Sequence, residues 1–206
     1  MRVTEMICRF AVFLLLVLAA CGPSREPLRK DDHWLNLRAN ALHGRAEEYY
    51  NSGRYAQAMV DYRSYLDQYI DLYRANDAAF RIAQCLEGLG ERMEAADAYR
   101  ATGLLFSRSG LAPSAHLRAG ELFELEGWLR EAKFDYEKAV EYQATGPGRL
   151  ALGRLEELRK RIAALEAERA DRRREGRQAP GGIDPALDRH RLVTNERTAL
   201  DLLLSR

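Results

Sequence analysis

Three segments of the chain share one pattern: "GRYAQAMVDY" (53–62), "GERMEAADAY" (90–99) and "GWLREAKFDY" (127–136). Their first residues are 37 positions apart along the chain, at Gly53, Gly90 and Gly127. An alanine and a tyrosine recur in the same phase, at Ala58, Ala95 and Ala132 and at Tyr62, Tyr99 and Tyr136. Self-similarity at a fixed period of a few tens of residues is typical of repeat proteins. The sequence therefore predicts three copies of one structural unit.

Two further kinds of residue recur in phase before each glycine. A small residue lies seven positions before it, at Ala46, Ala83 and Gly120, and a large one four positions before it, at Tyr49, Leu86 and Phe123. Small residues let two antiparallel helices pack closely, and a glycine at the end of a helix adopts a left-handed turn without strain. Large side chains fill the space between neighbouring helix pairs. Chance similarity of three unrelated helical hairpins is the alternative, and agreement at five positions argues against it.

The pattern resembles the tetratricopeptide repeat (TPR), which usually has a period of about 34 residues. The expected repeats span 39–72, 76–109 and 113–146, within a region from 34 to 146. The longer period, with "YRSYLDQY" followed by "NDAAFRIAQCLEGLG", resembles the repeats of the outer-membrane-assembly lipoprotein and the Tol-Pal coordinator. The resemblance implies an all-α fold, a right-handed superhelical stack of helix–turn–helix hairpins.

The N-terminal segment 1–20 has the features of a secretory signal peptide. Arg2 and Arg9 precede an apolar run at 10–20, which is shorter than the roughly 20 residues that a spanning helix needs but suits a signal sequence. "LAAC" (18–21) resembles the lipobox of bacterial lipoproteins, which implies that Cys21 carries a diacylglyceryl group. An uncleaved anchor or an ordinary signal peptide is the alternative.

The lipobox resemblance implies an exported protein that is held at a membrane by its lipid. Gly22 after the cysteine implies the periplasmic face of the outer membrane. Residues 21–33 contain prolines and charges without apolar periodicity, which predicts a flexible tether. Cleavage would remove Cys8, and Cys85, within an apolar helical pattern, is expected to be a core residue.

Two elements are predicted after the repeats. Residues 147–173 read as one long charged helix with a narrow apolar stripe, at Leu155, Leu158, Ile162 and Leu165. The stripe suits a helix that covers the last open face of the stack, and a coiled-coil dimer is the alternative. Residues 174–206 are expected to be a linker and a short amphipathic helix, which would dock on a partner, fold back onto the chain's own groove, or fray.

The sequence contains no recognisable active site. The four histidines lack metal-ligand spacing, and neither a nucleophile elbow nor a phosphate or dinucleotide loop is present. With 32 basic and 31 acidic residues, the formal charge of +1 gives no bulk attraction to nucleic acid. We therefore predict a protein that is not an enzyme, without a metal, cofactor or small-molecule substrate and without nucleic-acid binding.

A partner-binding groove is predicted along the first helix of each repeat, because these helices line the concave side of such stacks. In the phase of the repeat, its candidate residues are His43, Glu47, Tyr50, Phe80, Gln84, Glu87, Leu117, Glu121 and Glu124. The glutamates disfavour an acidic ligand and favour a basic or mixed extended segment, unless these are ordinary solvated residues. The favoured function is a scaffold for protein partners in a cell-envelope assembly, with a periplasmic chaperone for exported polypeptides as the alternative.

Overall fold

The computed structural model describes residues 33–174 and 196–205, which form helices joined by short turns. The helices are α2 (His33–Asn51), α3 (Tyr55–Tyr69), α4 (Ala75–Gly88), α5 (Arg92–Leu105), α6 (Ala112–Leu125), α7 (Leu129–Val140), α8 (Gly146–Arg174) and α10 (Glu196–Leu204). The chain divides into two units, Met1–Leu35 and Asn36–Arg206, and the packing described below is that of the second. The predicted signal peptide, Cys21 and the tether up to residue 32 lie outside the described residues.

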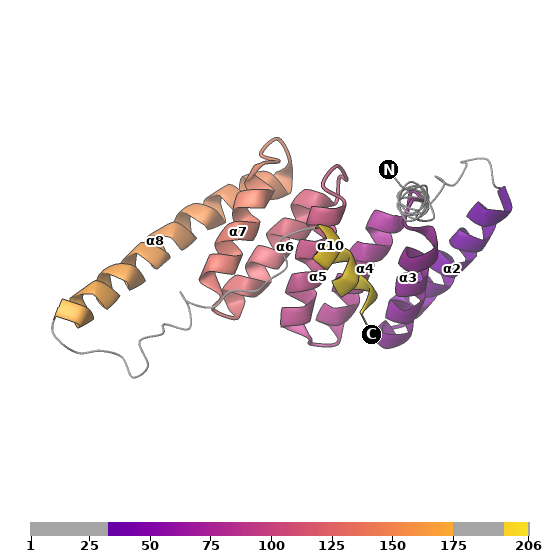
Figure 1. Cartoon of the computed structure of the whole chain (residues 1–206), viewed down its shortest axis with the longest axis horizontal. Helices are drawn as coiled ribbons and strands as arrows, with labels where there is room; N and C mark the ends of the chain where they lie inside the picture. Colours follow the sequence, from indigo (N-terminus) through magenta and orange to yellow (C-terminus); the bar gives the residue numbers. More distant parts are fainter. Residues whose placement is uncertain (1–32, 175–195, 206) are drawn as a thin grey trace, which may run out of the picture. The chain divides into compact units, whose positions relative to one another are not determined.

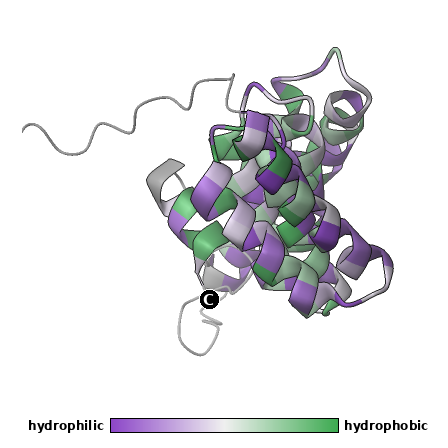
Figure 2. Ribbon diagram, turned by 90° about the vertical axis from the view of Figure 1, so that its right-hand side faces the viewer, coloured by the Kyte–Doolittle hydropathy of each residue, from purple (hydrophilic) through white to green (hydrophobic). Residues whose placement is uncertain are grey.

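The helices pack in chain order, α3 on α4, α4 on α5, and so on to α8 (Figure 1). The all-α class predicted from the sequence is therefore confirmed for the described residues. Hydrophobic and hydrophilic residues alternate along the helices that can be seen in Figure 2, which allows a helix to bury one side against its neighbours. None of the described helices combines the length and the apolar composition that crossing a bilayer requires.

The three repeat glycines form the same turn between α2 and α3, α4 and α5, and α6 and α7. Their φ angles are +73° at Gly53, +83° at Gly90 and +78° at Gly127, and no other described residue has a positive φ. In each turn the N–H after the glycine donates to the carbonyl five residues earlier, as from Glu91 to Leu86 at 2.9 Å. This bond is that of a Schellman helix end, which requires the left-handed conformation. The predicted glycine turns are confirmed.

We expect Gly90→Ala to lower the free energy of unfolding by about 1–2 kcal/mol, since a left-handed φ costs an L-residue about that much. No atom lies within 4 Å of a Cβ added there, so the effect would be conformational rather than steric. Gly153→Ala is the matched control, because its added Cβ is equally unobstructed but lies inside α8. It should raise stability by roughly 0.5–1 kcal/mol. Urea titrations followed by circular dichroism measure both, and equal effects would contradict the argument.

The recurring alanines and tyrosines form the centre of each helix pair. Ala46, Ala83, Ala58, Ala95 and Ala132 are fully buried. Gly120 takes the small position in the third pair, where an added Cβ would lie 2.6 Å from the ring of Tyr136. Tyr62, Tyr99 and Tyr136 are also buried. The small residues thus make room for the tyrosine rings, as the spacing predicted.

A column of residues along α4, α6 and α8 packs on the helix before it. Its members are Ala78, Ile82 and Cys85 on α4, Ala115, Ala119 and Leu122 on α6, and Ala151, Leu155 and Leu158 on α8, all buried. The matching positions on α2 are Ala41, Arg45 and Glu48, which are exposed. Tyr49, predicted to fill a gap between pairs, is only half-buried for the same reason: no described helix precedes α2. These positions are therefore apolar and buried on α4, α6 and α8, but two of the three are charged on α2.

Helix α8 occupies the place that a fourth first helix would take. It packs on α7 and α6 through the buried Leu155 and Leu158, whereas Ile162 and Leu165 are half-buried. The predicted helix at 147–173 is confirmed, and its covering of α6 and α7 agrees with the capping role. Dimerisation through the outer half of the stripe stays a prediction.

A buried ion-pair network joins α5 to α7 and α6. Arg100 is fully buried and lies 2.7 Å from Asp135 and 2.6 Å from Glu131. Asp135 also bonds to Nδ1 of His116 at 2.9 Å, and the Arg100 guanidinium lies over the ring of Phe123 at 4.4 Å. Burial opposes the charged guanidinium, but the two carboxylates outweigh it and raise the pKa of Arg100 above its usual value. The charge is therefore kept inside the protein by its partners.

The C-terminal helix folds back onto the second helices of two pairs. Helix α10 packs on α5 and, less extensively, on α3, with Ala199 and Leu203 fully buried. The predicted amphipathic helix is confirmed. Of the three alternatives predicted for it, the structure shows a helix folded back onto the chain, but on α5 and α3 rather than on the first helices α2, α4 and α6. Ala95–Gly103 of α5 are all buried, because α4, α6 and α10 all pack on this helix.

Candidate functional site: the first-helix face

The candidate groove residues lie on α2, α4 and α6, and their glutamates accept hydrogen bonds from the repeat tyrosines. Tyr99 donates to Glu87 at 3.1 Å and Tyr136 to Glu124 at 2.8 Å. Tyr62 donates to Glu47, one helical turn earlier than in the other pairs, because Tyr50 occupies the position of Glu87 and Glu124. Each bond links the two helices of one pair. The glutamates are therefore fixed by the fold before any partner binds.

Two arginines connect successive first helices across this face. Arg81 on α4 lies 3.0 Å from Glu47 on α2, and Arg118 on α6 bonds to Glu87 on α4 and to Glu121 at 2.8 Å. Arg161 on α8 lies 3.7 Å from Glu124 on α6. We call this series the Glu–Arg ladder. It joins α2, α4, α6 and α8 in order, and its side chains stay partly open to solvent.

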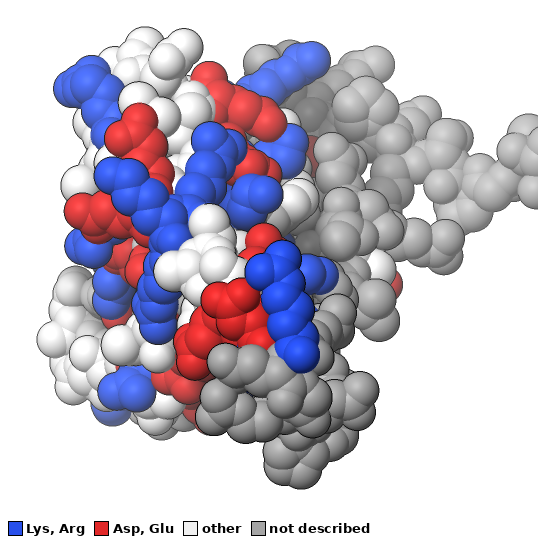
Figure 3. All heavy atoms as spheres, turned by 90° about the vertical axis from the view of Figure 1, so that its left-hand side faces the viewer, with Lys and Arg blue, Asp and Glu red and all other residues white. Residues whose placement is uncertain are grey.

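The ladder makes this face mixed in charge rather than acidic. The hydrogen bond from Arg118 holds the pKa of Glu87 below its usual value, and that from His43 does the same for Asp77. Burial, then the bonds to glutamates, raises the pKa of Tyr62 and Tyr136 above the usual range. At the α8 end of the molecule, acidic and basic side chains are likewise interspersed (Figure 3). Glu87 therefore remains ionised and paired with Arg118 at neutral pH.

The structure corrects the predicted exposure of two groove residues. His43 is 2% exposed and lies edge-on to the rings of Tyr62 and Tyr65, each 5.5 Å away. Leu117 is also buried, at 9% exposure. Both lie one turn nearer the start of their helices than the glutamates, where the second helix of the pair covers them. They support the face from beneath and do not offer a surface to a partner.

The remaining candidates are half-buried along the same face. Phe80 packs edge-on against Tyr99 at 5.1 Å, and Gln84 accepts a bond from Arg81 at 3.1 Å. Tyr50 lies beneath the Arg81 guanidinium, 4.6 Å from its ring centre. The structure thus brings Glu47, Tyr50 and Gln84 together around one arginine. These side chains form a polar and aromatic surface that is half open to solvent.

Among the described residues, His43, Glu47 and Asp77 have ligand atoms within 4.8 Å of one another, close enough for a metal ion. Their hydrogen bonds, however, are made with protein groups. His43 Nε2 bonds to Asp77 at 2.9 Å, its Nδ1 lies 3.3 Å from Arg74, and Glu47 is held by Arg81. Two guanidinium groups supply the positive charge that a metal would bring. The cluster is best described as part of the ion-pair network, and the absence of a metal stays a prediction.

Sequence reasoning missed Arg81 and Arg118, two of the three arginines of the ladder. A signal was present, since the two are 37 residues apart and each directly follows a groove candidate, Phe80 or Leu117. The first repeat has Gly44 there, so the position does not recur three times. Considering only the recurrent glutamates made the face look more acidic than it is.

Cys85 belongs to the core and not to this face. It is fully buried, and burial raises its pKa to about 12, so its thiol stays protonated and unreactive at neutral pH. Its predicted role as a small core residue is confirmed.

No protein-family model matches the chain, and a comparison with curated proteins finds no match either.

Proposed function

We propose that the chain is a lipid-anchored, non-enzymatic TPR scaffold that binds an extended segment of a protein partner on the first-helix face. Its place would be the periplasmic side of the outer membrane, in an assembly for outer-membrane biogenesis, division-linked envelope work, or a pilus or secretion complex. Cys21 would carry the lipid, and residues 22–33 would let the helices reach partners away from the membrane surface.

The observation that carries the proposal is the Glu–Arg ladder on a surface made by repeated helices. Three helix pairs with the same glycine turn place equivalent side chains at regular intervals. Arrays of this kind present extended surfaces to extended ligands. The ladder adds paired charges of both signs, which suit a polypeptide with mixed charge better than a strongly acidic one. This surface is the support for a binding role over a catalytic one.

The binding surface can be tested by site-specific photocrosslinking in the bacterium that makes the protein. A photoreactive residue at Gln84, within the face, should give one discrete crosslinked product. The same residue at Arg130, exposed on α7, is the matched control and should give none. Many diffuse products at Gln84 would favour the chaperone over the scaffold. No product at Gln84 would contradict binding at this face.

Anchoring is tested separately by Cys21→Ser. We expect the unmodified protein to lose its lipid, measured by mass spectrometry, and to move from the membrane fraction to the soluble fraction, because the lipid is its only proposed anchor. A Cys8→Ser variant should keep both the lipid and the membrane association. Retention of the Cys21→Ser variant in membranes would contradict the lipoprotein assignment and leave the crosslinking result unaffected.

A further inference from the structure

Apolar side chains and a hydrogen bond at its end hold α10 on the surface formed by α3 and α5. Among the described side chains of α10, Ala199 and Leu203 are fully buried, and Arg63 Nε on α3 donates to the Leu203 carbonyl at 3.2 Å. A cation at this position stabilises the C-terminal end of a helix. Helix α10 has nine residues, and helices this short are unstable in water without packing. Its helical structure therefore depends on α3 and α5.

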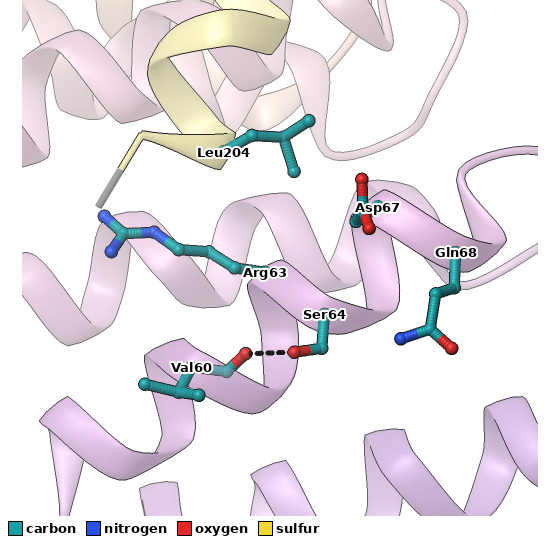
Figure 4. Close-up of a pocket in the computed structure, with 6 residues that line it drawn as sticks. All are labelled: Val60, Arg63, Ser64, Asp67, Gln68 and Leu204. Atoms are coloured by element: carbon teal, nitrogen blue, oxygen red, sulfur yellow. Dashed lines mark hydrogen bonds between the residues drawn. The ribbon is translucent and has the colours of Figure 1, made fainter.

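The same surface is larger than the helix that occupies it. A cavity of about 590 Å³ lies beside Leu204, lined by α3 residues that include Val60, Ser64 and Gln68 (Figure 4). Val60 is 61% exposed, so this cavity has an apolar side chain open to solvent next to Leu204. A second cavity of about 400 Å³ lies beside Ser205. The last turn of α10 thus leaves space on both sides.

The second cavity indicates the chemistry of a better occupant. Its lining contains the apolar side chains of Met59 and Leu86, the carboxylates of Glu91, Glu94 and Asp97, and the guanidinium of Arg63. The carboxylates outnumber the one cation, and Glu91 and Glu94 are exposed. Ser205 also lines this cavity, and its short side chain fills little of it. A lysine or arginine there would cover the apolar floor with its methylene groups and place its charge near the carboxylates. A basic residue also suits the end of a helix.

We propose that the α3–α5 surface is a binding site for an amphipathic partner helix with a basic C-terminal end, and that α10 is a tethered segment which such a helix displaces. The site is separate from the first-helix face, so it would give the protein a second, regulated interaction. The 21 residues between α8 and α10 keep the segment on the same chain. Tethering raises its local concentration to roughly millimolar, so a free helix competes only if it fits better.

The test uses the full chain and a fluorescent peptide of residues 192–206. Leu203→Asp should release α10, and the variant should then bind the peptide at least tenfold more tightly than the unmodified chain does. Asp201→Asn, on the exposed side of α10, is the matched control and should behave as the unmodified chain. If Leu203→Asp lowers the helix content by more than the nine residues of α10 account for, the variant has disturbed the rest of the fold. Leu203→Ala then replaces it in the comparison.

The peptide itself tests the chemistry of the occupant. A peptide carrying Ser205→Lys should bind the Leu203→Asp chain about fivefold to tenfold more tightly than the original, and one carrying Ser205→Glu should bind more weakly. Failure of every peptide to bind would show that α10 is a fixed part of the fold and would overturn the proposal. A chain that is a dimer, and becomes a monomer with Leu203→Asp, would assign the site to a second copy and overturn it equally. Neither result depends on the first-helix face.

Discussion

Asp135→Ala is expected to lower the free energy of unfolding by about 3–5 kcal/mol, the usual cost of removing one partner from a buried ion pair. Arg100 would keep Glu131 at 2.6 Å but lose the carboxylate that lies deepest in the protein. His116 would lose its hydrogen-bond acceptor in the same step. Urea titration of the full chain, followed by circular dichroism, measures the loss.

Lys138→Ala is the matched control for this change, because it breaks a surface ion pair on the same helix. Lys138 lies 2.7 Å from Glu141 with both side chains open to solvent, and such pairs contribute at most about 1 kcal/mol. If Asp135→Ala cost no more than Lys138→Ala, water would have to reach Arg100 in the folded protein. That result would contradict the burial of the network.

Tyr136→Ala should also destabilise the protein by about 3–5 kcal/mol, in the range for large aromatic residues truncated in a core. The ring is fully buried and lies against Gly120, where even one added carbon would collide with it. Because α6 and α7 meet so closely at this point, the surrounding helices have little freedom to close the cavity. The midpoint of a thermal or urea transition reports the effect.

Tyr136→Phe separates the ring from its hydroxyl group. It keeps the packing against Gly120 and removes only the hydrogen bond to Glu124, so we expect a loss of about 1 kcal/mol. A similar loss for Tyr136→Phe and Tyr136→Ala would mean that the hydrogen bond, and not the packing, determines stability here. It would contradict the role assigned to the small residues.

The parts of the fold that were predictable from the sequence are those that each pair must repeat. A left-handed turn needs glycine, and a close helix crossing needs a small residue opposite a ring. Gly53, Gly90 and Gly127 therefore revealed the turns. The recurring tyrosines revealed the core in the same way, because each helix pair has the same gap between its two helices and fills it with a tyrosine ring.

Features that occur once escaped prediction, because no periodicity distinguishes them. Arg100 and Arg63 occupy equivalent positions 37 residues apart, yet one lies in a buried network and the other holds the end of α10. The two arginines differ in the helix that follows them. Helix α7 supplies Asp135 to Arg100, whereas α5 has Ala98 at the equivalent position and gives Arg63 no carboxylate there. His43 was misplaced for a related reason, since the pattern identified its helix face but not the depth of its side chain.

The polar start of the stack has a consequence for the protein at high concentration. Where α4, α6 and α8 bury an apolar column, α2 offers Arg45 and Glu48 to water. Trp34 and Leu37, nearer the start of α2, are exposed as well, so the edge is mixed, with its charges at the later positions. Modular arrays with two sticky ends concatenate into filaments. Another molecule that added its terminal helix at this edge would have to bury Arg45 and Glu48, and that cost opposes such growth.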